Sequence, residues 1–173
     1  MKKNHISFVL GGATCGKSIF AVQLAKKLKK DVVYVATSLP TDSEMQRKIN
    51  DHQKQRPSDW VTLEAAKAPF DILGSEKIIP CMLIDGTTFW VSSLMLEGKS
   101  FFDIREKAKI FLEAAKAKVE NLIIVSDEVG GGIVPVNDLA RHFREIQGKV
   151  NQDIAACADQ VYWIAAGIPV QIK

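Results

Sequence analysis

The sequence predicts a three-layer α/β domain with a mostly parallel central sheet and helices on both faces. Two observations lead to this fold class. First, the apolar runs are near-continuous rather than alternating, which is typical of parallel strands that are buried on both faces. Second, helical patterns lie between these runs, and a repeated strand-then-helix order favours right-handed crossovers. The predicted strands are residues 6–10, 32–36, 81–84, 122–125 and 161–165.

The helices follow from apolar periodicity. They are predicted over residues 18–30, 43–53, 88–96, 102–118 and 137–158. Short strands are also expected at residues 61–64 (VTLE) and at an edge formed by residues 170–172. Two less regular regions, residues 40–63 and 127–135, follow predicted strands or lie close to them. We therefore expect them to line the carboxyl edge of the sheet, where open α/β folds bind ligands.

The composition is that of one globular domain spanning residues 1–173. Hydrophobic residues make up 47% of the chain and charged residues 25%, so a sizeable core can form. A net charge of +3 is too weak to indicate a nucleic-acid partner. No apolar stretch approaches the roughly 18 residues of a membrane span, and the N-terminal apolar run is too short for a signal peptide. We expect neither a nucleic-acid partner nor a membrane span.

The cysteines are Cys15, Cys81 and Cys157, which are widely spaced and odd in number. They form no C-x-x-C pair, so neither a disulfide framework nor a zinc site is expected. A reducing cytoplasm is the simpler location for such a chain. Cys81 and Cys157 lie in apolar runs and are expected in the core.

The most informative segment is residues 11–18, GGATCGKS, which fits the phosphate-binding pattern G-x-x-x-x-G-K-[ST] without a mismatch. It lies between a predicted strand and a predicted amphipathic helix, which is the context in which this pattern binds nucleotides. Lys17 is expected to reach the β- and γ-phosphates, and the Ser18 hydroxyl is expected to ligate Mg2+. The alternative is a tight turn that happens to contain Lys-Ser. The expected nucleotide contacts here are Gly11, Gly12, Ala13, Thr14, Cys15, Gly16, Lys17 and Ser18.

Three carboxylates near strand ends are candidates for the same site. Asp85 follows the apolar run 81–84 and could hold magnesium directly or through water. Its alternative role is that of a turn or cap residue before Gly86. Asp127 and Glu128 follow the next apolar run and compete with Asp85, or they form a turn before three consecutive glycines.

His52 lies in the polar segment NDHQKQRP. No second histidine or cysteine lies near it at metal-ligand spacing, so a zinc site is not expected. The residues alone favour a surface histidine, and the functional interpretation is a nucleophile whose ring nitrogen forms a covalent intermediate. Glu64 ends the strand 61–64 and is either solvated or in contact with the ribose or base of a nucleotide. His142 lies in an arginine-rich helix and is expected on its surface.

Several stretches carry a more specific signal than the phosphate loop alone. They are GGATCGKS (11–18), VYVATS (33–38), HQKQRPSDW (52–60), EVGGGIVP (128–135) and LARHFREIQGKVNQ (139–152), followed by the C-terminal GIPVQIK. In this order they resemble the bifunctional adenosylcobinamide kinase / adenosylcobinamide-phosphate guanylyltransferase family of cobalamin biosynthesis. The resemblance spans nearly the whole chain. It implies a RecA-like P-loop fold and a homotrimer.

The resemblance also implies two reactions. Such enzymes phosphorylate the aminopropanol hydroxyl of adenosylcobinamide, a corrinoid, with ATP or GTP, and then transfer GMP from GTP to that phosphate and release pyrophosphate. A histidine in an H-x-x-x-R-P pattern carries the GMP; here it is His52, which overturns the surface interpretation. Lys17 stabilises the developing charge, and Mg2+ is implied at Ser18 and Asp85. The further nucleotide contacts implied are Thr37, Ser38, Leu39, Gln53, Lys54, Gln55, Arg56, Glu64 and Asp85.

The chain departs from the family pattern at two places in the site. Thr14-Cys15 replaces the usual Arg-Ser, which could weaken one phosphate contact or change the preferred triphosphate. Asp85 replaces a common glutamate, so magnesium could be held through water. The other catalytic residues remain, and activity is expected. Two alternatives stay open: a monofunctional kinase of another small alcohol, and a nucleotide-sensing protein without turnover.

Overall fold

The computed structural model describes residues 4–28, 30–38, 47, 49, 53, 56–64, 73 and 77–173. These residues form a seven-stranded sheet in the order β3-β2-β4-β5-β1-β6-β7, parallel throughout except for the pair β6 and β7. The strands are β1 (His5–Gly11), β2 (Val32–Ala36), β3 (Val61–Glu64), β4 (Cys81–Asp85), β5 (Asn121–Asp127), β6 (Gln160–Ala165) and β7 (Ile168–Gln171). The helices are α1 (Lys17–Lys27), α3 (Thr87–Leu96), α4 (Phe101–Lys118) and α5 (Asp138–Cys157). The predicted mostly parallel α/β fold is confirmed.

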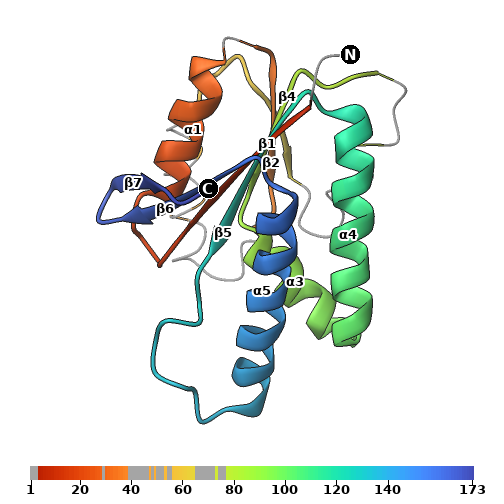
Figure 1. Ribbon diagram of the computed structural model, residues 1–173, viewed down its shortest axis with the longest axis vertical. Coiled ribbons are helices and arrows are strands. Elements are labelled where there is room, and N and C mark those ends of the chain that lie inside the picture. The colour runs from red at the N-terminus through yellow and green to blue at the C-terminus, as the bar shows by residue number, and fades with distance from the viewer. Residues whose placement is uncertain are drawn as a thin grey trace.

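The sheet is the middle of three layers. Helix α1 covers one face, and α3, α4 and α5 cover the other (Figure 1). Successive residues of a strand point to opposite faces, so Ile123 of β5 packs in the cluster beneath α1 and Ile124 packs in the cluster on the other side. Because both faces of β5 are buried, its sequence is a continuous apolar run rather than an alternating one.

The helices agree with the predicted ones apart from their ends. Helix α1 ends at Lys27 instead of residue 30, because the N–H of Leu28 bonds to the carbonyl oxygen of Ala25 at 3.1 Å and tightens the final turn. The predicted helix 43–53 lies mostly outside the described residues, although Arg47 is among its helical positions. Within the described ranges, no helix has the length and apolarity needed to cross a bilayer.

The predicted C-terminal edge strand is present, but it starts earlier than expected. Strand β7 begins at Ile168 rather than at residue 170 and pairs antiparallel with β6. The connecting residues Ala166 and Gly167 have φ values of 50° and 81°, and two successive left-handed residues make the tight hairpin turn that suits twisted strands. The turn thereby places a short hairpin beside β1, the strand that leads into the phosphate loop.

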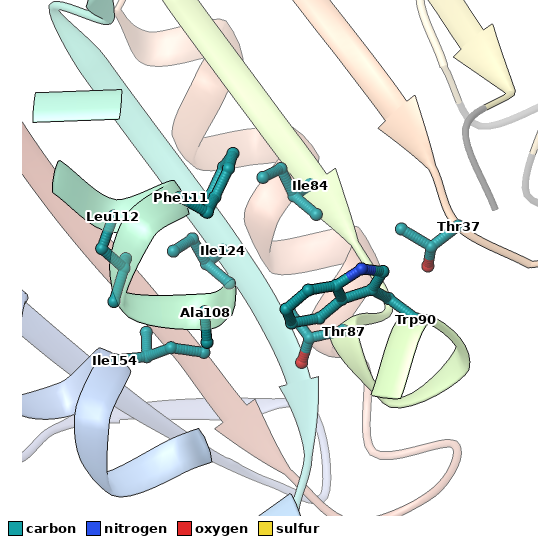
Figure 2. Close-up of a pocket in the computed structure, with 9 residues that line it drawn as sticks. All are labelled: Thr37, Ile84, Thr87, Trp90, Ala108, Phe111, Leu112, Ile124 and Ile154. Atoms are coloured by element: carbon teal, nitrogen blue, oxygen red, sulfur yellow. The ribbon is translucent and has the colours of Figure 1, made fainter. Parts of the chain in front are cut away.

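A small cavity lies between the sheet and the helices α3, α4 and α5 (Figure 2). Its volume is about 20 Å³, enough for a single water molecule at most. The lining is almost entirely apolar: Thr37, Ile84, Thr87, Trp90, Ala108, Phe111, Leu112, Ile124 and Ile154. The cavity is therefore part of the packed core and is too small for a nucleotide.

Candidate active site

The carboxyl ends of β1, β4 and β5 meet at one edge of the sheet. In the parallel register Gly11 of β1 lies opposite Asp127 of β5, and Asp85 of β4 lies opposite Val125 of β5. The phosphate loop, the turn at Gly86 and the glycine-rich segment after β5 all leave the sheet at this edge. It is the edge at which open α/β folds bind their ligands.

A cleft of about 360 Å³ opens at this edge, a volume typical of small-molecule sites. Many of the predicted nucleotide contacts line it: Ala13, Thr14, Gly16, Lys17, Ser18, Ser38, Arg56 and Asp85. Asp127, which the sequence offered as an alternative to Asp85 for holding magnesium, lines the cleft as well. Sequence reasoning did not single out Phe89 or Ile49, which contribute apolar side chains to the lining.

The backbone of the phosphate loop explains why glycine occurs at two of its positions. Gly16 precedes α1 with a φ of 97°, a conformation that side chains with a Cβ rarely adopt. At Gly11, an added Cβ would lie 2.6 Å from the carbonyl oxygen of Ile164 in β6, and real Cβ atoms essentially never come within 3.0 Å of such a neighbour. Thr14 also has a positive φ, 54°, which is uncommon outside glycine and occurs preferentially at functional sites.

The start of α1 suits an anion. No side chain caps this end through a hydrogen bond, and no acidic residue lies in the first turn. The first amide groups of a helix lack partners within the helix, and the helix dipole places partial positive charge there. A phosphate group next to Gly16 and Lys17 would supply both the acceptors and the negative charge.

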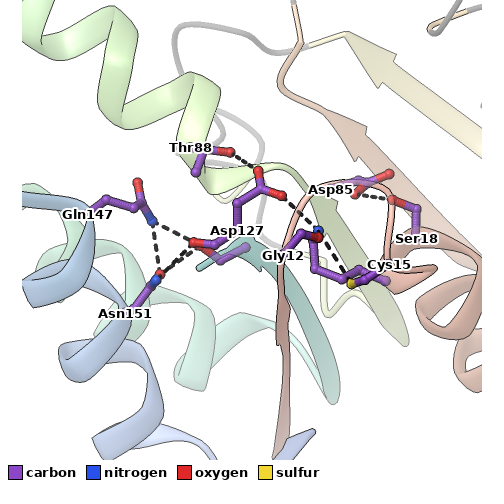
Figure 3. Close-up of polar contacts among 10 residues, drawn as sticks. Gly12, Cys15, Ser18, Asp85, Thr88, Asp127, Gln147 and Asn151 are labelled. Carbon is purple, nitrogen blue, oxygen red and sulfur yellow. Dashed lines mark hydrogen bonds and ion pairs between the residues drawn. The ribbon is translucent and has the colours of Figure 1, made fainter. Parts of the chain in front are cut away.

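Lys17 contacts both the phosphate loop and the end of β5, through Gly12 and Asp127, which are labelled in Figure 3. Its Nζ donates to the carbonyl oxygen of Gly12 at 2.6 Å and pairs with Asp127 Oδ1 at 2.7 Å. The other carboxylate oxygen of Asp127 accepts a 2.7 Å hydrogen bond from the hydroxyl of Thr88, in the first turn of α3. The ammonium group is thus held at the mouth of the loop, where the β- and γ-phosphates of a nucleotide are expected.

Asp85 faces Ser18, the expected magnesium ligand of the phosphate loop. Its Oδ1 accepts a 3.0 Å hydrogen bond from Ser18 Oγ, and its Oδ2 accepts one from the hydroxyl of Tyr34. Burial and, next, the Asp85 carboxylate raise the pKa of the Tyr34 hydroxyl above its ordinary 10.0. Tyr34 therefore stays a hydrogen-bond donor to Asp85. Sequence reasoning missed this role, and the only signal was a phenol inside the otherwise apolar strand VVYVA.

Ser18 and Asp85 form the kind of donor set that magnesium takes. A hydroxyl oxygen and a carboxylate oxygen 3.0 Å apart are hard donors, and Mg2+ in phosphate-transfer sites completes its shell with phosphates and water. Within the described part of the chain, no three or more His, Cys, Asp or Glu side chains converge as a metal cluster. A hydroxyl and a single carboxylate would suit an ion that is also bound by phosphate oxygens.

The segment before β3 reaches the cleft through Arg56. Its guanidinium lies 3.8 Å from the centre of the Tyr34 ring, a cation–π contact. Nearby, Gln53 Nε2 donates a 3.4 Å hydrogen bond to Glu64 Oε1, so two predicted nucleotide contacts are brought together on the exposed side of β3. Neither of these two lines the cleft itself.

Other predicted contacts fall in different places. Thr37 is buried, its hydroxyl donates to the Asp85 carbonyl oxygen at 2.8 Å, and it lines the small core cavity rather than the cleft. Gly11, Gly12 and Cys15 belong to the loop backbone beneath the cleft. The predicted contacts that lie outside the described residues are Leu39, His52, Lys54 and Gln55.

A buried polar cluster joins the end of β5 to α5, and the sequence alone did not predict it. Gln147 Nε2 donates to Ser126 Oγ and to Asn151 Oδ1, both at 2.9 Å, and Asn151 Nδ2 donates to the main-chain oxygen of Asp127 at 3.1 Å (Figure 3). Gln147 and Ser126 are fully buried. The signal lay in α5, where two amide side chains four residues apart occupy the face that packs against the sheet.

The two arginines of α5 serve the glycine-rich segment rather than the cleft. Arg144 donates to the main-chain oxygens of Gly130 and Ile133, the latter at 3.1 Å, and Arg141 donates to that of Pro135 at 2.9 Å. These bonds satisfy carbonyl groups that lie outside any regular element.

Comparison with known proteins agrees with this geometry. The model of the family described as cobinamide kinase / cobinamide phosphate guanyltransferase matches residues 7–172. A bifunctional adenosylcobalamin biosynthesis protein, CobU, from Salmonella typhimurium is 37% identical, and the alignment covers 95% of this chain and 98% of the relative. The corresponding CobU of Escherichia coli K12 is 36% identical with the same coverage, and CobP of Pseudomonas aeruginosa is 36% identical over 95% of each chain. The chain therefore belongs to the cobinamide kinase / cobinamide phosphate guanyltransferase family and is an enzyme.

Proposed function

We propose that this enzyme phosphorylates adenosylcobinamide with ATP or GTP and then transfers GMP from GTP to the product, giving adenosylcobinamide-GDP and pyrophosphate. The observation that carries the proposal is the placement of Lys17 and Ser18 opposite two carboxylates, Asp127 and Asp85, in a chain of this family. A phosphate loop alone would fit many reactions. Membership of this family supports a corrinoid as the acceptor.

In the kinase step, the aminopropanol hydroxyl oxygen attacks the γ-phosphorus of the triphosphate. The bond from that phosphorus to the β–γ bridging oxygen breaks, the nucleoside diphosphate leaves, and the hydroxyl proton is released. The Lys17 ammonium and the amides at the start of α1 stabilise the charge that develops on the phosphate oxygens. Magnesium held by Ser18 and Asp85 would neutralise further phosphate charge when bound.

In the guanylyl transfer, a ring nitrogen of His52 attacks the α-phosphorus of GTP. The bond to the α–β bridging oxygen breaks and pyrophosphate leaves. A phosphate oxygen of adenosylcobinamide phosphate then attacks the same phosphorus, the P–N bond breaks, and His52 is restored. His52 lies outside the described residues, so its role rests on the H-x-x-x-R-P match. Arg56, the arginine of that pattern, lines the cleft, which supports the proposal.

The first test is the intact mass of the protein after incubation with GTP and Mg2+ in the absence of corrinoid. We expect a gain of one GMP that is labile in acid and stable in base, as a phosphoramidate is. His52→Ala should abolish the gain, and His142→Ala, at an exposed position of α5, should keep it. If His52→Ala formed the adduct at the wild-type rate, the nucleophile would be another residue. If the wild type bound GTP but gained no mass, a kinase or a sensor without guanylyl transfer would be the better assignment.

We also propose a homotrimer in the cytoplasm. The segment before α5 carries apolar side chains that another subunit could cover, since Ile133 and Val136 are 96% and 97% exposed. Cys15, Cys81 and Cys157 are all free thiols, as is usual in a reducing compartment. Sedimentation equilibrium measures the assembly, and a monomer at micromolar concentration would contradict the trimer.

A further inference from the structure

Lys17 and Asp127 form a shielded ion pair inside the cleft. Their nitrogen and oxygen lie 2.7 Å apart, and the side chains are 9% and 33% exposed, respectively. Attraction between such charges is stronger than in bulk water because little solvent screens it. The terminal phosphates of a nucleotide are expected at the same ammonium, so they bring negative charge close to a carboxylate that is already there.

Asp127 is held in position both at its carboxylate and at its main chain. Its Oδ2 accepts a hydrogen bond from Thr88, which is 7% exposed, while its main-chain oxygen accepts one from Asn151. Asn151 Oδ1 accepts hydrogen bonds from Gln147 (Figure 3) and from Ser126. Both of these partners are fully buried. A carboxylate anchored in this way does not swing out of the cleft freely when phosphate enters.

We propose that Asp127 determines nucleotide affinity by acting as the counter-ion of Lys17. It balances the ammonium when the site holds no phosphate, and it opposes the binding of di- and triphosphates, so that the diphosphate product leaves readily. The inference rests on the proposed function, because it takes the phosphate loop to be the nucleotide site. Asp127 acts through Lys17 and is therefore a positioning and affinity-determining residue rather than a catalytic one.

Asp127→Asn is the informative variant. The amide oxygen can still accept from Lys17, and the amide nitrogen can donate to the Thr88 hydroxyl, so the shape and the contacts remain while the charge is lost. Because one nearby negative charge is removed, we expect GTP and GDP to bind about tenfold more tightly. GMP lacks the phosphates that Lys17 contacts, so its affinity should not change.

The measurement is titration calorimetry of GTP in EDTA, so that the guanylyl transfer proposed above does not consume it, and of GDP and GMP with Mg2+ and with EDTA. The thermal midpoint and the rate of adenosylcobinamide phosphorylation are measured for each protein as well. Asp138→Asn is the matched control: it removes one aspartate charge at an exposed position outside the cleft and should leave all three affinities unchanged. Asp127→Ser removes the same charge with different packing and should also favour GTP and GDP, which covers the case in which Asp127→Asn does not fold.

The possible results separate the roles of Asp127. Unchanged or weaker binding of GTP by folded variants overturns the inference, as does equal tightening for GMP. Unchanged affinity with a large loss of phosphorylation rate would make Asp127 the proton acceptor of the substrate hydroxyl instead, which also overturns it. If the wild type bound none of the three nucleotides, the proposed function itself would be wrong. If the wild type bound them and the Asp127 variants bound them with the same affinity, only the counter-ion role of Asp127 would be wrong.

Discussion

The main-chain N–H of Gly167, in the turn between β6 and β7, donates a 2.9 Å hydrogen bond to the carbonyl oxygen of Cys15 in the phosphate loop. The backbones of Gly16 and Gly167 also lie close together, because an added Cβ at Gly16 would be 3.3 Å from the Cα of Gly167. The C-terminal hairpin is therefore one wall of the phosphate loop, and residues about 150 positions apart in the chain determine its shape together.

The first two glycines of the loop should respond differently to alanine. At Gly11 the new methyl would meet the Ile164 carbonyl oxygen of β6 at 2.6 Å, so the loop or the hairpin must shift. At Gly12 an added Cβ meets nothing within 4 Å. We expect Gly11→Ala to weaken GTP binding at least tenfold, or about 1.4 kcal/mol, and Gly12→Ala to change it by less than about threefold. Calorimetric titration checks both, and equal effects would show that the hairpin contact does not shape the site.

Tyr34 should control the use of magnesium. Its hydroxyl fixes one oxygen of Asp85 while Ser18 faces the other, and loss of such a supporting contact typically weakens metal binding about tenfold or more. We therefore expect Tyr34→Phe to raise the Mg2+ concentration needed for half-maximal activity by about tenfold.

Tyr162→Phe is the matched control for this variant. It removes a hydroxyl that bonds to Gln160 at 3.0 Å, away from Asp85. The Mg2+ dependence should stay as in the wild type, and nucleotide affinity in EDTA should stay unchanged in both variants. A Tyr34→Phe enzyme with the wild-type Mg2+ requirement would argue against Asp85 as a metal ligand.

The sequence predicts the phosphate loop and most strands because their signals are local. GGATCGKS between an apolar run and an amphipathic pattern needs no knowledge of distant residues. The partners of the loop are different. Asp85 and Asp127 both follow buried runs, and only the strand order β4-β5-β1 decides that one meets Ser18 and the other meets Lys17.

The residues missed from the sequence share the same cause. Thr88 meets Asp127 from 39 positions away, and Gln147 meets Ser126 from 21 positions away. In the sequence each is an ordinary polar residue of a helix, and it gains a role only because α3 and α5 pack over the end of β5. The hairpin turn at Ala166 and Gly167 was missed for a different reason, since alanine gives no signal for a positive φ.

Helices α4 and α5 are joined by a bidentate ion pair, which should stabilise the fold in a pH-dependent way. Arg105 donates to both oxygens of Asp153 at 2.8 Å, and these bonds lower the pKa of the Asp153 carboxyl below its ordinary 3.8. The stabilisation is therefore present above pH 3.8 and is lost as the pH falls below it. We expect Asp153→Asn to lower the free energy of unfolding by about 1 kcal/mol at pH 7, with the difference shrinking in acid.

Urea unfolding at pH 7 and pH 3.5 measures this difference. Glu113→Gln is a suitable comparison, because Glu113 pairs with Lys116 at 2.8 Å but is 69% exposed. An exposed pair contributes little, so that variant should stay within about 0.5 kcal/mol of the wild type. If the two variants lost equal stability at pH 7, the Arg105–Asp153 pair would be no more than a surface contact.

Alkaline conditions should destabilise the protein through Cys81. This residue of β4 is fully buried beneath α1, and burial raises the pKa of its thiol from 9.0 to about 11. Between these values the folded protein keeps a proton that the unfolded chain has lost. The contribution of Cys81 to the free energy of unfolding is therefore fully present below pH 9.0 and is lost as the pH rises. One such group changes the free energy of unfolding by at most about 1.4 kcal/mol per pH unit.

The variant Cys81→Ala lacks the thiol and tests this. The unfolding free energy of the variant, measured in urea under reducing conditions, should fall less steeply between pH 9 and pH 10.5 than that of the wild type. Because the missing sulfur lowers stability by the same amount at every pH, the slope is the informative quantity, and parallel curves for the two proteins would show that Cys81 does not contribute to the alkaline loss.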